Sequence, residues 1–296
     1  MSARTKAHLA LLACSFFWGV TFVVVKNALL DISVFAYLSA RFILGALPLI
    51  WFYRDDLRKM TRDEVWAGLQ VGLFMFGGYA FQTAGIARTT ASKSAFITGL
   101  SVVFVPIFLA VFWRKKIGAW AWLGAAASFV GLYYLTVPPE GLANLNRGDL
   151  LVMGCAVLYA MQIIFISGYS GKYSLGALSC LQVMLAGTLA TVAVPILNVS
   201  RLEPFFVRYT FQMEFGVIVT AIFTTALAYP LLVWGQKHTT ATNTALILTF
   251  EPVFAAITSF IVLHERLGGR SLLGAVLILG GICIAEWKGT IPVTES

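Results

Sequence analysis

Apolar residues fill this chain in runs of about twenty, and short polar stretches separate the runs. A run of that length is what an α-helix needs to cross the hydrocarbon core of a bilayer. The longest polar connections are residues 54–64, 138–148 and 199–212. We therefore predict an all-α integral membrane protein with ten transmembrane helices, at residues 8–28, 33–53, 66–87, 92–113, 118–137, 149–169, 174–198, 213–235, 241–263 and 270–288.

The pattern occurs twice along the chain. Residues 79–131, moved by 150 positions, fall on residues 229–281 without a gap, and fifteen of the 53 positions are identical. The segment around Cys14 matches the segment around Cys155 at an offset of 141 positions. A fixed self-similarity of this kind indicates an internal duplication. We predict two five-helix repeats in one membrane domain, residues 1–140 and 141–296, with Pro138-Pro139 near the boundary.

An odd number of helices in each repeat decides their relative orientation. Two consecutive five-helix units must lie in opposite senses in the membrane, which is the inverted-repeat plan of many secondary transporters. Such repeats enclose a central cavity. With the N-terminus inside, the inner segments hold twelve Lys and Arg residues and the outer segments eight. We expect a bacterial inner-membrane protein with both termini cytoplasmic.

Composition excludes several other classes. The chain is 59% hydrophobic and 11% charged, with a mean hydropathy of +0.85, which rules against a soluble domain. The net charge of +8 lies mostly in short loops, so we expect no nucleic-acid partner. The four cysteines show no C-x-x-C spacing and no phosphate-binding motif occurs, so we expect no metal, no cofactor and no enzymatic activity. The expected partners are a small-molecule substrate and the lipid bilayer, with the chain monomeric or weakly dimeric.

Polar side chains within the predicted helices are the candidates for a substrate site, because hydrocarbon offers them no partner. Four hydroxyl residues at the start of and within helix 92–113 fall on one stripe of about 80°: Thr90, Ser94, Thr98 and Ser101. The repeat copy carries Thr240, Thr244 and Glu251 on the same stripe. A single hydroxyl often bonds to its own helix instead. The duplicated stripe favours a cavity. The candidate substrate-binding residues are Trp18, Arg41, Tyr79, Gln82, Ser94, Thr98, Ser101, Tyr159, Gln162, Tyr229, Thr244 and Glu251.

Glu251 and Arg41 are the most unusual of these. Pro252 follows Glu251 and removes a backbone donor, so we predict a kink near Leu248 at the middle of the membrane. The Glu251 carboxylate either faces substrate or is protonated or paired with Arg41. Arg41 correspondingly pairs with Glu251 or meets a substrate carboxylate. A separate set of small residues predicts close helix packing without chemistry: Gly124, Gly131, Gly274 and Gly281.

Several motifs resemble EamA-type permeases of the drug/metabolite transporter superfamily. They are Trp18-Gly19 with Lys26, Arg41-Phe42, Glu251-Pro252-Val-Phe and Glu265-Arg266-Leu267. The resemblance covers the whole chain and includes YddG-like amino-acid exporters. It implies an export permease with a central cavity lined by both halves, with the fifth and tenth helices towards the periphery. Lys115 and Val102 depart from the pattern, where a glutamate and a proline would match it.

The leading functional hypothesis is export of small metabolites, above all amino acids, by alternating access. Aromatic, hydroxyl and amide groups suit a small zwitterion, whereas a phosphorylated substrate would need several cations near the midplane. The alternative is a multidrug exporter of lipophilic cations. A membrane-embedded enzyme or a channel is a weaker option, because metal-binding clusters and a charged ring are absent from the sequence.

Overall fold

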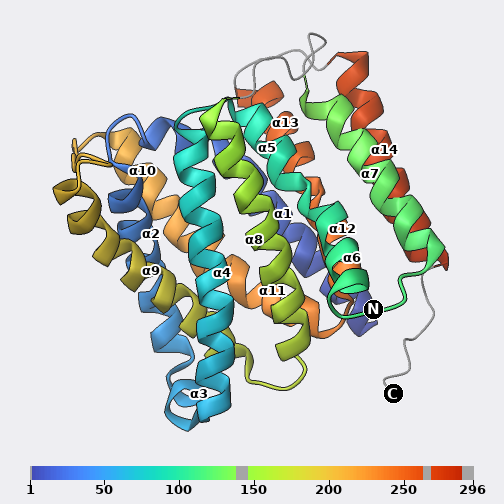
Figure 1. The fold of residues 1–296 in the computed structure, drawn as a ribbon, viewed down its shortest axis with the longest axis horizontal. Helices are drawn as coiled ribbons and strands as arrows, with labels where there is room; N and C mark the ends of the chain where they lie inside the picture. The colour runs from blue at the N-terminus through green and yellow to red at the C-terminus, as the bar shows by residue number, and fades with distance from the viewer. Residues whose placement is uncertain (1, 138–145, 263–267, 289–296) are drawn as a thin grey trace.

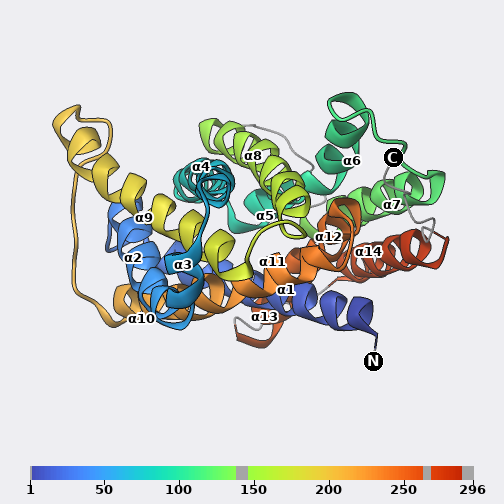
Figure 2. The ribbon, with the colours of Figure 1, turned by 90° about the horizontal axis from the view of Figure 1, so that it is seen from below.

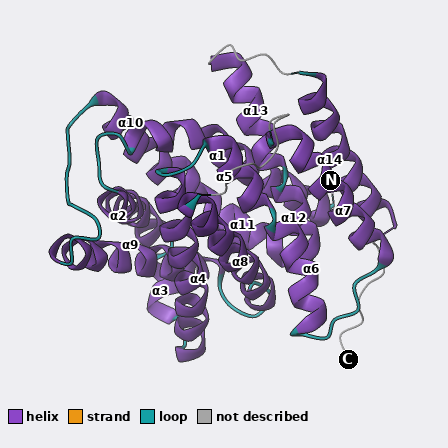
Figure 3. Ribbon diagram, turned by 45° about the horizontal axis from the view of Figure 1, so that its top comes forward, coloured by secondary structure: helices purple, strands orange, loops and turns teal. Residues whose placement is uncertain are grey.

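Helices make up nearly all of the regular structure in the computed structural model, which describes residues 2–137, 146–262 and 268–288. Within these ranges the chain is drawn as helices and loops (Figure 3). The only β-structure of the described residues is an isolated antiparallel bridge between Ile32 and Val207. The first half contains α1 (Ala3–Ala28), α2 (Val34–Phe52), α3 (Arg54–Lys59), α4 (Arg62–Ile86), α5 (Ala91–Gly99), α6 (Ser101–Val111) and α7 (Ala119–Thr136). The second contains α8 (Arg147–Tyr169), α9 (Leu175–Val199), α10 (Phe211–Val219), the π-helix η1 (Thr220–Leu227), α11 (Ala228–Lys237), α12 (Ala241–Leu248), α13 (Phe250–Val262) and α14 (Gly269–Lys288).

Seven segments of the described chain are long and apolar enough to cross a bilayer. The prediction of a helical multi-pass membrane protein is confirmed. The prediction of ten spans is not, because α4, α7 and α14 fall outside this set. The seven segments are Ala3–Ala28, Val34–Phe52, Lys93–Val111, Arg147–Tyr169, Leu175–Val199, Phe211–Lys237 and Ala241–Thr258.

Three predicted helices are interrupted, and a short helix lies in a predicted connection. The helix predicted at 241–263 divides at Thr249, which confirms the kink, since Pro252 has no N–H for the carbonyl of Leu248. The helix predicted at 92–113 divides at Leu100, next to Gly99, although no proline stands at position 102. The helix predicted at 213–235 contains η1. The break at Leu100, the π-helix η1 and the short helix α3 were not predicted, because they depend on packing that hydropathy does not report.

The two halves pack mainly on one another. α4 lies between α8 and α9, and α1 packs against α11 and α13 (Figure 1). α7 and α14 form a pair at one edge of the molecule, and α2 and α9 lie at the other edge (Figure 2). The peripheral position of α7 and α14 agrees with the expectation for the fifth and tenth helices. The predicted glycine seam is confirmed, because Gly124 faces Gly281 and Gly131 faces Gly274 across this pair.

Helix starts follow the capping residues in the sequence. Thr61 with Glu64 and Asn146 with Asp149 form capping boxes at the first turns of α4 and α8. Thr90 and Thr240 occupy matched positions in the repeats and cap α5 and α12. The hydroxyls of these two threonines accept backbone N–H groups, so the polar stripe begins with capping groups rather than with cavity residues.

Candidate substrate cavity

An internal cavity lies between the halves and is lined by residues of α1, α2, α4, α5, α6, α8, α11 and α13 with the α12–α13 break. Most of the candidate residues meet there. Ser94 and Thr244 do not line the cavity; both are fully buried, and their hydroxyls have no hydrogen-bond partner in the described chain. The candidate residues that line it are Trp18, Arg41, Tyr79, Gln82, Thr98, Ser101, Tyr159, Gln162, Tyr229 and Glu251.

Arg41 is held at the cavity wall by hydroxyl groups. Its Nη2 donates to Thr224 Oγ1 at 2.7 Å and to Tyr79 OH at 3.1 Å, and its Nε donates to Thr225 Oγ1 at 3.1 Å. The guanidinium carbon lies 4.5 Å from the centroid of the Tyr79 ring. Only 4% of Arg41 is exposed, so these neutral partners position a buried cation without neutralising its charge. The cavity lining includes Arg41 together with Tyr79, so the guanidinium lies at the boundary of the cavity.

The π-helix explains how two consecutive residues reach Arg41. Thr224 and Thr225 lie in η1, and both side chains are fully buried against α2. Insertion of a residue into a helical turn turns adjacent side chains towards one side, and such π-turns are frequent at functional sites. Sequence reasoning missed both threonines, because it treated 213–235 as regular helix and looked for isolated polar residues. The Thr-Thr pair beside Thr220 is the signal that could have located them.

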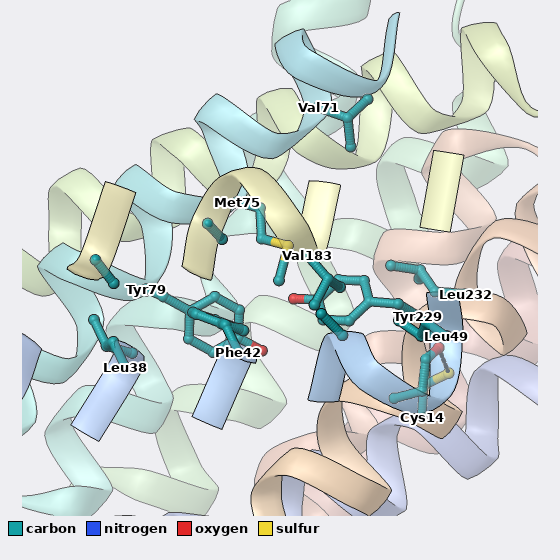
Figure 4. Close-up of a cluster of buried hydrophobic side chains, with 14 of the residues drawn as sticks. Cys14, Leu38, Phe42, Leu49, Val71, Met75, Tyr79, Val183, Tyr229 and Leu232 are labelled. Atoms are coloured by element: carbon teal, nitrogen blue, oxygen red, sulfur yellow. Dashed lines mark hydrogen bonds between the residues drawn. The ribbon is translucent and has the colours of Figure 1, made fainter. Parts of the chain in front are cut away.

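Aromatic rings form the rest of the wall. Tyr79 contacts Tyr159 edge-on with centroids 5.5 Å apart, and Trp18 lies 5.9 Å from Tyr229. The Trp18 indole N–H donates to the Thr224 carbonyl at 3.0 Å, which fixes the orientation of its ring. Tyr79 and Tyr229 come from matched positions of the two repeats and lie in the same buried cluster (Figure 4). Their matched placement supports the duplicated cavity face.

Amide side chains extend the polar surface. Tyr159 OH donates to Gln82 Oε1 at 3.1 Å, and Gln82 Nε2 donates to Thr98 Oγ1 at 3.2 Å. Gln162 Nε2 donates to Gln182 Oε1 at 3.0 Å, while Gln182 Nε2 has no partner in the described chain. These bonds join α4 to α5 and α8, and α8 to α9, and they restrain the side chains that face the cavity.

Glu251 lies in the first turn of α13, directly after the break at Thr249. The positive end of a helix dipole favours a carboxylate at such a position. Within the described residues its side chain makes no hydrogen bond, and no ion pair within 4 Å joins it to Arg41. Arg41 and Glu251 therefore line one cavity without pairing directly. A methyl group at Gly19 would collide with the Glu251 carbonyl, so glycine allows α1 to approach the break closely.

A multi-pass helical chain with a polar, aromatic-walled cavity between two interlocked halves has the features of a small-molecule transporter. The chain belongs to the EamA-like transporter family, whose sequence model matches residues 5–137 and 146–287. This confirms the resemblance at the level of the family. The Glu265-Arg266-Leu267 motif and the boundary at Pro138-Pro139 lie outside the described residues.

Relatives across several lineages are named as transporters. An uncharacterized transporter of Archaeoglobus fulgidus is 33% identical over 291 residues, covering 96% of this chain and 87% of that protein. The uncharacterized transporter YoaV of Bacillus subtilis is 20% identical and covers 94% and 95%. A chloroplastic WAT1-related protein of Arabidopsis thaliana is 23% identical, covering 92% of this chain and 67% of that protein. The first two names support a transporter rather than an enzyme, and none of the three names a substrate.

A solved structure shares the fold. A crystal structure titled only as that of a protein superposes with a TM-score of 0.78 at 15% identity, covering 96% of this chain and 97% of the other. At this identity the likeness establishes the architecture alone.

Proposed function

We propose that this chain exports small metabolites, with amino acids as the main substrates, across the bacterial inner membrane by alternating access between two inverted repeats. The observation that carries the proposal is the presence of Arg41 and Glu251 in one cavity without an ion pair between them. A zwitterion would place its carboxylate at Arg41 and its ammonium group at Glu251, where each would find its complement. The twelve candidate residues belong to this proposal, and Ser94 and Thr244 would act from behind the cavity wall.

The aromatic wall supports a variable substrate side chain. Trp18, Tyr79, Tyr159 and Tyr229 offer apolar ring faces beside polar edges, which accommodate side chains of different size. Arg41 is the single arginine or lysine lining the described cavity, which is fewer cations than a phosphorylated substrate needs.

A second candidate is export of lipophilic cations. It is favoured by the Glu251 carboxylate, which has no hydrogen-bond partner in the described chain and shares the cavity with Trp18 and Tyr229. A carboxylate among ring faces is a suitable site for a quaternary ammonium group. This reading leaves Arg41 as a structural cation.

Two substitutions separate the candidates in proteoliposomes supplied with a panel of amino acids and one quaternary ammonium compound. For an amino-acid exporter, Arg41→Gln and Glu251→Gln both abolish amino-acid flux, since each removes one of the two charges that the substrate needs. For a cation exporter, Glu251→Gln abolishes cation flux and Arg41→Gln preserves it or increases it. Arg58→Gln and Glu214→Gln, both exposed and outside the cavity, are the matched controls. Absence of flux for every amino acid in the panel would refute the leading proposal.

A further inference from the structure

The cavity approaches the end of the molecule opposite the N-terminus. Its last lining residues on that side are Val25 of α1, Ile86 of α4 and Ala95 of α5. Ile86 and Ala95 join Phe22 in a small apolar cluster that is almost fully buried. This cluster forms a thin apolar layer between the cavity and the helix ends beyond it.

A polar cluster lies immediately beyond the apolar layer. Thr89 Oγ1 donates to Asp149 Oδ1 at 2.5 Å, and Lys93 Nζ lies 3.8 Å from Asp149 Oδ2. Lys26 Nζ donates to the Thr89 carbonyl at 3.2 Å. Asp149 is 2% exposed, so these charge-assisted contacts operate away from bulk water, where they are strong. The four residues tie together α1, the α4–α5 connection, α5 and α8.

The repeats place a counterpart at the opposite end. Thr239 corresponds to Thr89 at the offset of 150, and His8 corresponds to Asp149 at the offset of 141. The structure joins this pair too, because His8 Nε2 lies 3.4 Å from Thr239 Oγ1. The offsets of 150 and 141 therefore map the Thr89–Asp149 contact onto the His8–Thr239 contact.

The helices beneath the two contacts match as well. A methyl group at Gly85 would meet Val152 and the Gly148 carbonyl, and one at Gly235 would meet Leu11 and the Ala7 carbonyl. Leu11 and Ala7 stand 141 positions before Val152 and Gly148. α4 therefore closes on α8 at one end as α11 closes on α1 at the other. The two repeats therefore place equivalent helix contacts at the two ends of the molecule.

The contacts at the two ends differ in strength. The Thr89–Asp149 bond is short, buried and charged, whereas the His8–Thr239 contact is long and partly exposed. Lys93, which pairs with Asp149, has the neutral Asn243 as its counterpart. Ile86 of the apolar layer is replaced by Gln236, whose two polar side-chain atoms are buried without partners in the described chain. An unsatisfied buried amide disfavours closure, because opening to water would satisfy it.

We infer that Thr89, Asp149, Lys93 and Lys26 form the gate at the end away from the N-terminus, and that this gate is stronger than its His8–Thr239 counterpart. The resting protein is then closed at the Asp149 end and opens first at the N-terminal end. This inference rests on the proposed alternating access. With the N-terminus in the cytoplasm, it makes the empty transporter load from the cytoplasm, as an exporter must.

Site-directed labelling tests the gate without any substrate. Thr83 lines the cavity just beneath the apolar layer, so Thr83→Cys, in a background lacking the native cysteines, is a suitable reporter. A membrane-impermeant maleimide is applied to either face, in intact cells and in inverted vesicles. We expect faster labelling from the N-terminal face. Asp149→Asn and Thr89→Val should each raise labelling from the opposite face on the order of tenfold, the factor expected for loss of a charge-assisted hydrogen bond.

The matched control is Asn146→Ala. Asn146 shares the α8 capping box with Asp149 but contacts neither Thr89 nor Lys93 among the described contacts. It should leave labelling from the far face unchanged. An equal rise with Asn146→Ala, an equal rise from both faces, or no rise with either gate variant would overturn the inference. Labelling as expected together with no amino-acid flux would refute the proposed substrate and leave the gate standing.

Discussion

Arg41 and Tyr79 are joined twice, since the guanidinium donates a hydrogen bond to the phenol oxygen at 3.1 Å and also stacks 4.5 Å from the ring centroid. The two contacts act in different directions and together fix the guanidinium plane. Tyr79 thus holds the guanidinium in one orientation at the cavity wall, which its position near the middle of a predicted helix did not specify.

Separating these two contacts gives the first prediction. Tyr79→Phe removes the hydrogen bond and keeps the ring, so KM for a zwitterionic substrate should rise up to about tenfold, as for loss of a bond to a charged group. Tyr79→Leu removes both contacts and should raise KM further. Initial rates in proteoliposomes measure both. Equal KM values for Tyr79→Phe and the unmodified protein would show that the phenol oxygen does not orient Arg41.

Glu251 gives the second prediction. Glu251→Gln keeps the shape of the side chain and removes its charge, so transport should fall or its pH dependence change, with normal expression. The carboxylate has no partner in the described chain to lose, which is why the fold should tolerate the change. Transport across a pH series, with expression checked by fluorescence of a fused reporter, measures the effect. Full activity with an unchanged pH profile would make Glu251 a scaffold residue.

The third prediction concerns the contact between α1 and the helix break. Gly19→Ala forces a methyl group against the Glu251 carbonyl and should destabilise the fold by about 1–3 kcal/mol, the usual cost of overpacking. Thermal unfolding in detergent measures it. Gly168→Ala is the control, because nothing lies within 4 Å of a methyl group there and helix propensity should leave stability equal or higher. Equal unfolding temperatures for the two variants would contradict the close approach.

The fourth prediction concerns pH and a carboxylate outside the predicted spans. Hydrogen bonds from the backbone N–H groups of Ser174 and Thr61 lower the pKa of Glu64. A carboxyl group with a lowered pKa in the folded state stabilises the fold above its unfolded pKa of about 4.3, and this contribution is lost as pH falls through the folded value.

Because Glu64 is only partly buried, solvent screens its interactions and the effect is small. Glu64→Gln should lower the unfolding temperature by about 1 °C at pH 7 and by less at pH 3, where more of the carboxyl group is protonated. Thermal unfolding at the two pH values measures it. Asp63→Asn, in the same helical turn and without these bonds, should leave the unfolding temperature unchanged. An equal shift with Asp63→Asn would assign the effect to net charge.

Much of the architecture follows from the order of residues alone. Hydrocarbon excludes unpaired backbone groups, so long apolar runs must be helices, and the duplicated motifs imply two related halves. The same exclusion makes intramembrane polar residues conspicuous, which is why ten of the twelve candidates line the cavity. The kink before Pro252 was predictable because a missing N–H is a local property.

The tertiary structure decided what depends on neighbours from distant parts of the chain. Thr224 and Thr225 both accept hydrogen bonds from Arg41 only because of the π-turn of η1. The break at Leu100 formed without a proline. Whether Arg41 would pair with Glu251 or with hydroxyls could not be read from spacing, since it depends on how α2 packs against η1. Hydropathy indicates whether a residue favours lipid or water, whereas tertiary packing determines which residues it contacts.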